Sequence, residues 1–160
     1  MREVKNALLR ELCYNWFKLE VRDWERGRLE MNAQIPAVIS AVIFGAVALF
    51  QLLLAAGLPF AHLSWGGKHQ GVLPGHMRLA SLLAACVLVF LTLVLLVRSG
   101  LLAMDVNHTV TLVLVWVITA FMGLNTLGNL ASKSRMEKVV MAPLTGVACV
   151  MCLLVAVWSS

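Results

Sequence analysis

Long runs of apolar residues dominate the chain from residue 35 onward. Four such runs can be delimited, at 35–58, 79–97, 109–130 and 139–158. An α-helix needs about 20 apolar residues to cross the roughly 30 Å hydrocarbon core of a membrane. Backbone polar groups in lipid must find partners within their own segment, so each run is predicted to be a helix. The connections are short: 59–78, 98–108 and 131–138. This pattern predicts an all-α, up-down four-helix bundle that spans a membrane.

Residues 1–34 follow a different pattern. They hold seven of the 13 Lys and Arg residues and six of the eight Asp and Glu residues. Apolar residues recur among them at helical spacing, at Val4, Leu8, Leu12 and Trp16. One apolar stripe with a mixed-charge face is typical of an amphipathic interfacial helix. We therefore expect two units: 1–34, a helix on the membrane surface or docked to a partner protein, and 35–160, the bundle.

Composition supports the membrane assignment. The chain is 61% hydrophobic and 13% charged, whereas a soluble domain carries about a quarter charged residues. In a membrane protein, the net charge of +5 indicates contact with anionic lipid headgroups. Nucleic-acid binding would require a basic face on a soluble module, and the sequence offers none. Membrane lipids are thus the expected partners.

The distribution of Lys and Arg predicts an orientation. Eight lie in the N-terminal segment and the second connection, against five in the first and third connections. Positive residues favour the cytoplasmic side. We therefore expect both termini on that side, of either a bacterial inner membrane or an organelle membrane.

The first connection contains three histidines, His62, His69 and His76, at intervals of seven residues. A zinc site would need further ligands in fixed geometry, but this connection has no Cys, Asp or Glu. Its four glycines and Pro74 also prevent a continuous helix that would align the imidazoles. No metal site is predicted here. We expect an ordered cap at the membrane surface, folded as a lid over one end of the bundle.

The third run carries Asn125 and Asn129, four residues apart and hence on one helix face. An amide facing lipid is costly, so both are predicted to point inward and to bond to a neighbouring helix or to the first connection. They either hold helices together, at about 0.6 to 2 kcal/mol each, or line a polar cavity. Further candidates for such a lining are Gln51, Ser81, Thr92 and Thr145. The spans lack central charges, which disfavours a pump or an ion-coupled transporter.

Cys149 and Cys152 form a C-x-x-C motif in the fourth run. Membrane oxidoreductases of the vitamin K epoxide reductase type carry such a motif, together with a second cysteine pair in a loop. Residues 59–78 contain no cysteine, and no cation that would activate a thiol lies nearby in sequence. Packing is the favoured role, and redox chemistry is the least favoured.

Two further motifs carry a resemblance. They are "WGGKHQGVLPGHMRLAS", residues 65–81, and "LNTLGNLAS", residues 124–132, with Glu137 following. In these motifs, residues 36–158 resemble a family of small bacterial four-span membrane proteins of unassigned function. The resemblance implies the four-span fold and no particular activity. It directs attention to Arg78 and Glu137, which the topology places at one end of the bundle, where we expect an ion pair.

Three functions remain open. The first is a non-enzymatic accessory or scaffold subunit that docks through residues 1–34. The second is a protein that binds or transports a lipid or small apolar molecule beneath residues 62–78. The third is a thiol oxidoreductase using Cys149 and Cys152. The predicted ligand-binding residues are Trp65, His69, Arg78, Asn125, Asn129 and Glu137. No cofactor or catalytic residue is predicted, and a homo-oligomer remains open.

Overall fold

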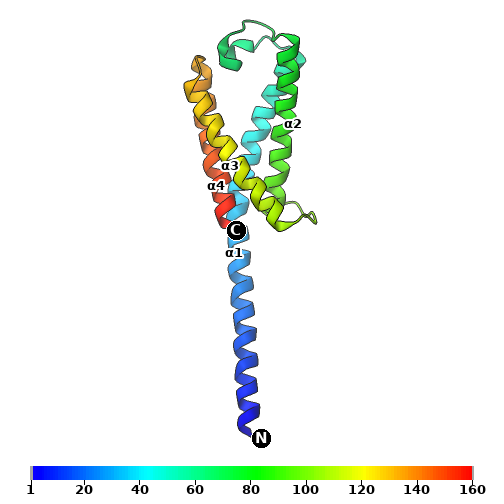
Figure 1. The fold of residues 1–160 in the computed structure, drawn as a ribbon, viewed down its shortest axis with the longest axis vertical. Coiled ribbons are helices and arrows are strands. Elements are labelled where there is room, and N and C mark those ends of the chain that lie inside the picture. The colour runs from blue at the N-terminus through cyan, green and yellow to red at the C-terminus, as the bar shows by residue number, and fades with distance from the viewer. Residues whose placement is uncertain (1, 160) are drawn as a thin grey trace.

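The computed structural model describes the backbone of residues 2–159 and the side chains of residues 10–12, 14–22 and 32–159. Four long helices account for most of it, in the order α1 (Arg2–Ala56), α2 (Gly75–Arg98), α3 (His108–Ala131) and α4 (Ala142–Trp158). Three shorter turns complete the described fold: η1 (Ala61–Leu63), η2 (Trp65–Gly67) and the π-helical η3 (Glu137–Met141). The predicted all-α architecture is confirmed (Figure 1).

Four segments are long and apolar enough to cross a membrane: Asn32–Ala56, Gly75–Arg98, His108–Ala131 and Glu137–Trp158. They coincide with the predicted runs to within a few residues at each end. Large apolar side chains such as Val42 and Leu124 lie on the outside, 67% and 69% exposed, whereas Ser40 and Ser81 are fully buried. Apolar surface with polar residues inside is what lipid as a solvent favours.

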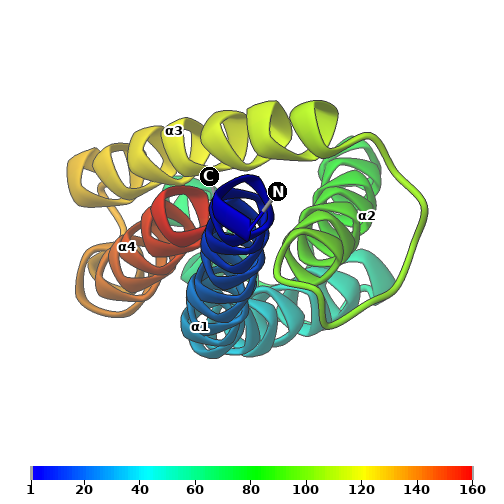
Figure 2. The ribbon, with the colours of Figure 1, turned by 90° about the horizontal axis from the view of Figure 1, so that it is seen from below.

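The bundle consists of two antiparallel hairpins, α1–α2 and α3–α4. They join where α1 packs against α4, and α3 crosses the end of α2 nearest their connection (Figure 2). From that crossing α2 and α3 diverge toward the opposite end, where the connection between α1 and α2 closes the top of the bundle (Figure 1). Both chain ends point away from that connection, as the up-down topology requires.

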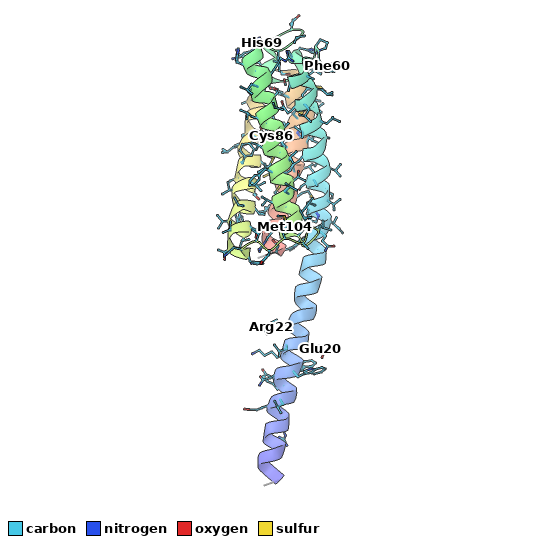
Figure 3. All side chains as sticks on the ribbon, turned by 90° about the vertical axis from the view of Figure 1, so that its right-hand side faces the viewer. Glu20, Arg22, Phe60, His69, Cys86 and Met104 are labelled. Atoms are coloured by element: carbon cyan, nitrogen blue, oxygen red, sulfur yellow. The ribbon has the colours of Figure 1, made fainter. Side chains whose placement is uncertain are left out.

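The helix α1 runs without a break through residue 34, the expected boundary between the two units. Residues 2–56 form one helix, and its first part extends beyond the bundle by about 45 Å at 1.5 Å per residue (Figures 1 and 3). The only proline inside the helix, Pro36, lacks an N–H but does not end the helix. In this segment the described apolar side chains, such as Trp16 and Phe17, are 65% and 64% exposed.

The core has two parts. The main cluster fills the space between the hairpins and includes Phe44, Leu95, Met122 and Val155. A second, smaller cluster joins Leu54 of α1 to Ala61 and Leu73 of the first connection. Because this connection has apolar contacts of its own, it is a folded element. We call residues 62–78, which include the first turn of α2, the cap.

Candidate functional site

The cap contains three consecutive residues in left-handed backbone. Trp65, Gly66 and Gly67 have φ angles of 54°, 76° and 67°, a region that favours glycine. A Cβ on Gly67 would also lie 3.3 Å from the Cβ of Ser134. The two glycines therefore serve both the turn and its close approach to the connection between α3 and α4.

The carboxylate of Glu137 holds the cap to that connection. The Gly66 N–H donates to both carboxylate oxygens, at 3.0 and 3.3 Å, and the Ser132 hydroxyl donates to one of them. Glu137 is only 9% exposed and lies in the first turn of the fourth span, where the helix dipole stabilises an anion. The two sequence motifs that carried the resemblance thus meet at this carboxylate.

Trp65 fixes the other side of the cap. Its indole Nε1–H donates to the Ser81 hydroxyl at 3.2 Å, and Ser81 is fully buried in α2. The cap is therefore bound to both hairpins, through Trp65 to α2 and through Gly66 to η3.

The predicted ion pair between Arg78 and Glu137 is wrong. The Arg78 Nε–H donates instead to the carbonyl oxygen of Ala55, at 2.8 Å. The guanidinium also packs on Gly57, where an added Cβ would lie 3.2 Å from it. A cation at the carbonyl end of α1 is favoured by the helix dipole and by the unpaired carbonyls there, so Arg78 caps α1.

The histidines do not converge. His69 lies at the outer end of the cap (Figure 3) and makes no hydrogen bond to another described residue, while His62 and His76 are exposed. Among the residues whose side chains are described, no group of three His, Cys, Asp or Glu side chains could hold a metal ion. The geometry therefore gives His69 no role in the contacts that bind the cap.

The two asparagines of α3 differ. The Asn129 Nδ2 donates to the Thr145 hydroxyl of α4 at 3.3 Å, and the Thr126 hydroxyl donates to the same oxygen at 3.1 Å. This agrees with the inward, interhelical prediction for Asn129. Asn125 is exposed and has no hydrogen bond to a described residue, so the prediction that both amides bond to a neighbour is wrong for Asn125. It borders the cavity described below.

The two cysteines of the C-x-x-C motif contact different helices. The Cys149 thiol donates to the Thr119 carbonyl oxygen of α3 at 3.5 Å. The Cys152 Sγ lies 3.8 Å from the Ser40 Oγ of α1. Both cysteines are free. These contacts are those of packing residues between helices, which is the role favoured by the sequence.

A cavity of about 490 Å³ lies between the hairpins beneath the cap. Its polar lining comes from Gln51, Ser64, Asn125, Asn129, Glu137 and Thr145. Its apolar lining includes Phe44, Val47, Leu88, Phe121, Met122 and Ala148. At 1.5 Å per residue, the wall along the fourth span runs about 16 Å from Glu137 to Ala148, roughly half the thickness of a hydrocarbon core. The cavity is therefore polar under the cap and apolar toward the membrane centre.

Two buried oxygens of this lining, Gln51 Oε1 and Ser64 Oγ, have no hydrogen-bond partner among the residues that the structure describes. Ser64, at the start of the cap, is only 7% exposed. Nearly all buried polar atoms in proteins have partners, and leaving one without costs about 1–3 kcal/mol. Both oxygens border the same cavity, so a polar group placed there could bond to them.

The cavity opens sideways. Val87 of α2 and Phe121 of α3 both line it, yet each is 46% exposed. These two helices diverge toward the cap (Figure 1). An amphipathic molecule could thus enter between them without displacing the cap.

Of the lining residues proposed from sequence, Gln51, Asn125, Asn129 and Thr145 border the cavity, together with Trp65 and Glu137. Ser81 instead bonds to Trp65, and Thr92 donates to its own helix at the Leu88 carbonyl. Ser64 is not among the residues predicted from sequence, because a serine before a W-G-G turn does not differ from an ordinary loop residue.

Comparisons with known proteins add no relative: no family model, no curated protein and no solved structure matches the chain.

Proposed function

We propose that the chain is a non-enzymatic integral membrane protein that binds a lipid or another small amphipathic molecule in the cavity beneath the cap. One observation carries this proposal: the buried oxygens of Gln51 and Ser64 are unpartnered and border one cavity. The volume of about 490 Å³ lies within the range of ligand pockets, which are mostly apolar with a few placed polar groups.

The energetics favour an amphipathic ligand over a purely apolar one. A chain that leaves the bilayer for an apolar cavity gains little, because lipid tails are as apolar as the side chains that replace them. A polar head that satisfies a buried oxygen can gain about 1 kcal/mol for each bond. The polar end of the cavity therefore decides what binds.

Native mass spectrometry from a mild detergent tests the proposal. Ala84 of α2 lines the cavity, so Ala84→Phe should fill it. Ala120 of α3 is exposed outside the cavity, so Ala120→Phe is the matched control. We expect a bound lipid-sized mass on the wild type and on the control, and its loss from Ala84→Phe. Equal occupancy of all three proteins would contradict the proposal.

A second candidate function is that of an accessory or scaffold subunit. It is favoured by the projecting part of α1, whose apolar side chains Leu12, Trp16 and Leu19 follow one another at helical spacing and are 59%, 65% and 49% exposed. Such a stripe fits a partner's groove. A partner should then co-purify with the full chain and be lost when all three side chains become Ser. Retention of that partner would exclude this role for the stripe.

For orientation, we propose that both termini lie on the cytoplasmic side of a bacterial inner membrane or its organelle equivalent. His69 and Met104 mark opposite ends of the bundle (Figure 3). In a background without the native cysteines, His69→Cys should react with a membrane-impermeant thiol reagent added outside intact cells, and Met104→Cys should not. The reverse pattern would contradict the proposed orientation.

A further inference from the structure

We infer that the cavity selects an amphiphile whose head carries hydroxyl or carboxamide groups and no negative charge, bound with that head beneath the cap. This inference rests on the proposed function and specifies its ligand class. It follows from the charges, the hydrogen-bonding state and the placement of the lining residues.

The charges of the lining residues disfavour an anionic head. Among the residues that line the cavity there is no Lys, Arg or His, and Glu137 is the single ionisable side chain in the lining. Glu137 is 9% exposed, so solvent screens it weakly. A phosphate or carboxylate head in the same polar end would meet a like charge and no counter-charge. Of the Lys and Arg residues in the cap, Lys68 is exposed and does not line the cavity, and Arg78 donates its Nε–H to the Ala55 carbonyl oxygen.

The glycine N–H groups of the W-G-G turn are not available to bind a ligand anion. Glycine-rich turns bind anions when consecutive N–H groups point into a concave site. In this cap those groups are already used: Gly66 N–H donates to Glu137 and Gly67 N–H donates to the Ser64 carbonyl at 3.0 Å. The W-G-G turn therefore binds the protein's own carboxylate and leaves no anion site for a ligand.

The unpartnered oxygens of Gln51 and Ser64 match a head that both donates and accepts hydrogen bonds. Gln51 Oε1 is an acceptor, and the Ser64 hydroxyl can both donate and accept. A ligand hydroxyl can donate to Gln51 and accept from Ser64. A ligand carboxamide also has both a donor and an acceptor. A hydroxyl or a carboxamide can therefore bond to the Gln51 amide whichever way its oxygen and nitrogen are placed. Asn125, which makes no bond to a described residue, adds a further amide at this end.

The positions of the lining residues determine the direction in which the ligand lies. Gln51 is five residues from the end of α1, close to the cap, whereas Phe44 and Ala148 line the deeper part of the cavity. A head at Gln51 leaves the chain among these apolar side chains. A chain longer than the cavity can continue into the bilayer between Val87 and Phe121, where the cavity opens.

Two probes that differ by one phosphate group, which carries about −1.5 to −2 charges at pH 7, test the inference on purified wild-type protein: monooleoylglycerol and its 3-phosphate. Their acyl chains are identical. In native mass-spectrometry titrations we expect the neutral probe to bind at least about tenfold more tightly than the phosphate, since one unfavourable charge contact is worth a tenfold step or more. Ala84→Phe should abolish binding of the neutral probe, and Ala120→Phe should not.

Variants assign the contacts. Gln51→Leu should weaken binding of monooleoylglycerol by about fivefold, the value of one neutral hydrogen bond, whereas Gln70→Leu, at an exposed cap position, should have no effect. Glu137→Gln should reduce the preference for the neutral probe to about threefold or less. An unchanged preference in Glu137→Gln would overturn the assigned role of this carboxylate.

Different results would contradict the headgroup inference and the proposed lipid-binding function. Phosphate binding as tight as that of the neutral probe, abolished by Ala84→Phe, would overturn the headgroup inference and leave the cavity as a lipid site. If neither probe binds the wild type more tightly than it binds Ala84→Phe, the proposed function itself is wrong. The wild-type comparison requires no variant of Glu137, so it stands even if that variant does not fold.

Discussion

Each end of the bundle is held together by one buried charged side chain, but only the cap end also has buried oxygens without hydrogen-bond partners. At the end opposite the cap, Arg98 is 7% exposed. Its Nε–H donates to the Ser159 hydroxyl at 2.9 Å, Nη1 donates to the His108 carbonyl at 3.0 Å, and Nη2 donates to the Ser159 carbonyl. Every contact there joins one helix end to another.

At the cap end, Glu137 similarly joins the cap to the fourth span. Here, however, the neighbouring Gln51 and Ser64 keep unpartnered buried oxygens above a cavity. A buried charged side chain whose hydrogen bonds are made to the protein itself stabilises the fold. Buried polar atoms without hydrogen-bond partners around a cavity are instead a feature of binding sites. We therefore propose a structural role for the Arg98 end and a binding role for the cap end.

The largest expected effect is that of Arg98→Ala. It removes three hydrogen bonds donated by a buried cation, so we expect a loss of about 3 kcal/mol in the free energy of unfolding, measured by thermal or denaturant unfolding in detergent. Arg98→Lys should lose less, because a charged donor remains. Lipid occupancy measured below the unfolding temperature should not change. A specific loss of occupancy would contradict the purely structural role of this end.

Next in size is Glu137→Ala, which removes the acceptor of the Gly66 N–H. Hydrogen bonds to charged groups are worth about 1.5–3 kcal/mol, so we expect a destabilisation of about 2 kcal/mol and faster hydrogen exchange at the Gly66 amide. Arg98→Ala should leave that amide's protection unchanged under native conditions. If both variants accelerate the Gly66 amide equally, the two ends are not independent.

A glycine series measures how closely the cap must approach. Gly67→Ala should cost about 1–2 kcal/mol, because its φ is +67° and its Cβ would press on Ser134. Gly71→Ala has a similar φ of +78° but no atom within 4 Å, so it should cost about 1 kcal/mol. Gly75→Ala, with neither feature, should be near neutral. Equal losses at Gly67 and Gly71 would show that the contact with Ser134 contributes nothing.

The smallest effects distinguish satisfied from unsatisfied amides. Asn129 bonds to Thr145, so Asn129→Leu should lower stability by about 0.6–1 kcal/mol. Gln51 Oε1 has no partner, so Gln51→Leu should leave stability unchanged or raise it by about 1 kcal/mol. Thermal unfolding of lipid-stripped protein in one detergent is the appropriate measurement. A loss in Gln51→Leu as large as that in Asn129→Leu would contradict the distinction between them.

Much of this fold follows from the sequence, because hydrophobic length is a strong constraint in a membrane. The four spans were located to within a few residues, and the spacing of Asn129 indicated its inward face. The course of residues 1–34 was not predictable in the same way. A helical stripe specifies which side chains share a face, but not whether the helix bends at its junction with a span, and Pro36 does not break the helix.

The candidate site could be predicted only in part. The cap motif and Glu137 were identified as belonging to one end of the bundle, but charge alone suggested an ion pair with Arg78. The backbone competes for both groups: the Ala55 carbonyl accepts from Arg78 and the Gly66 N–H donates to Glu137. Such side-chain-to-backbone bonds leave little trace in a sequence. The unpartnered state of Ser64 depends on packing in the same way.

The most direct test of the central claim is an experimental structure of the wild-type protein solved in lipid nanodiscs, at a resolution that distinguishes water from lipid. We predict elongated density in the cavity beneath the cap. Its head should lie within hydrogen-bonding distance of Gln51 Oε1 and Ser64 Oγ, with its chain passing Phe44 toward the opening between α2 and α3. A cavity that holds only ordered water, or one that is closed by repacked side chains, would contradict the claim that this end of the bundle binds an amphiphile.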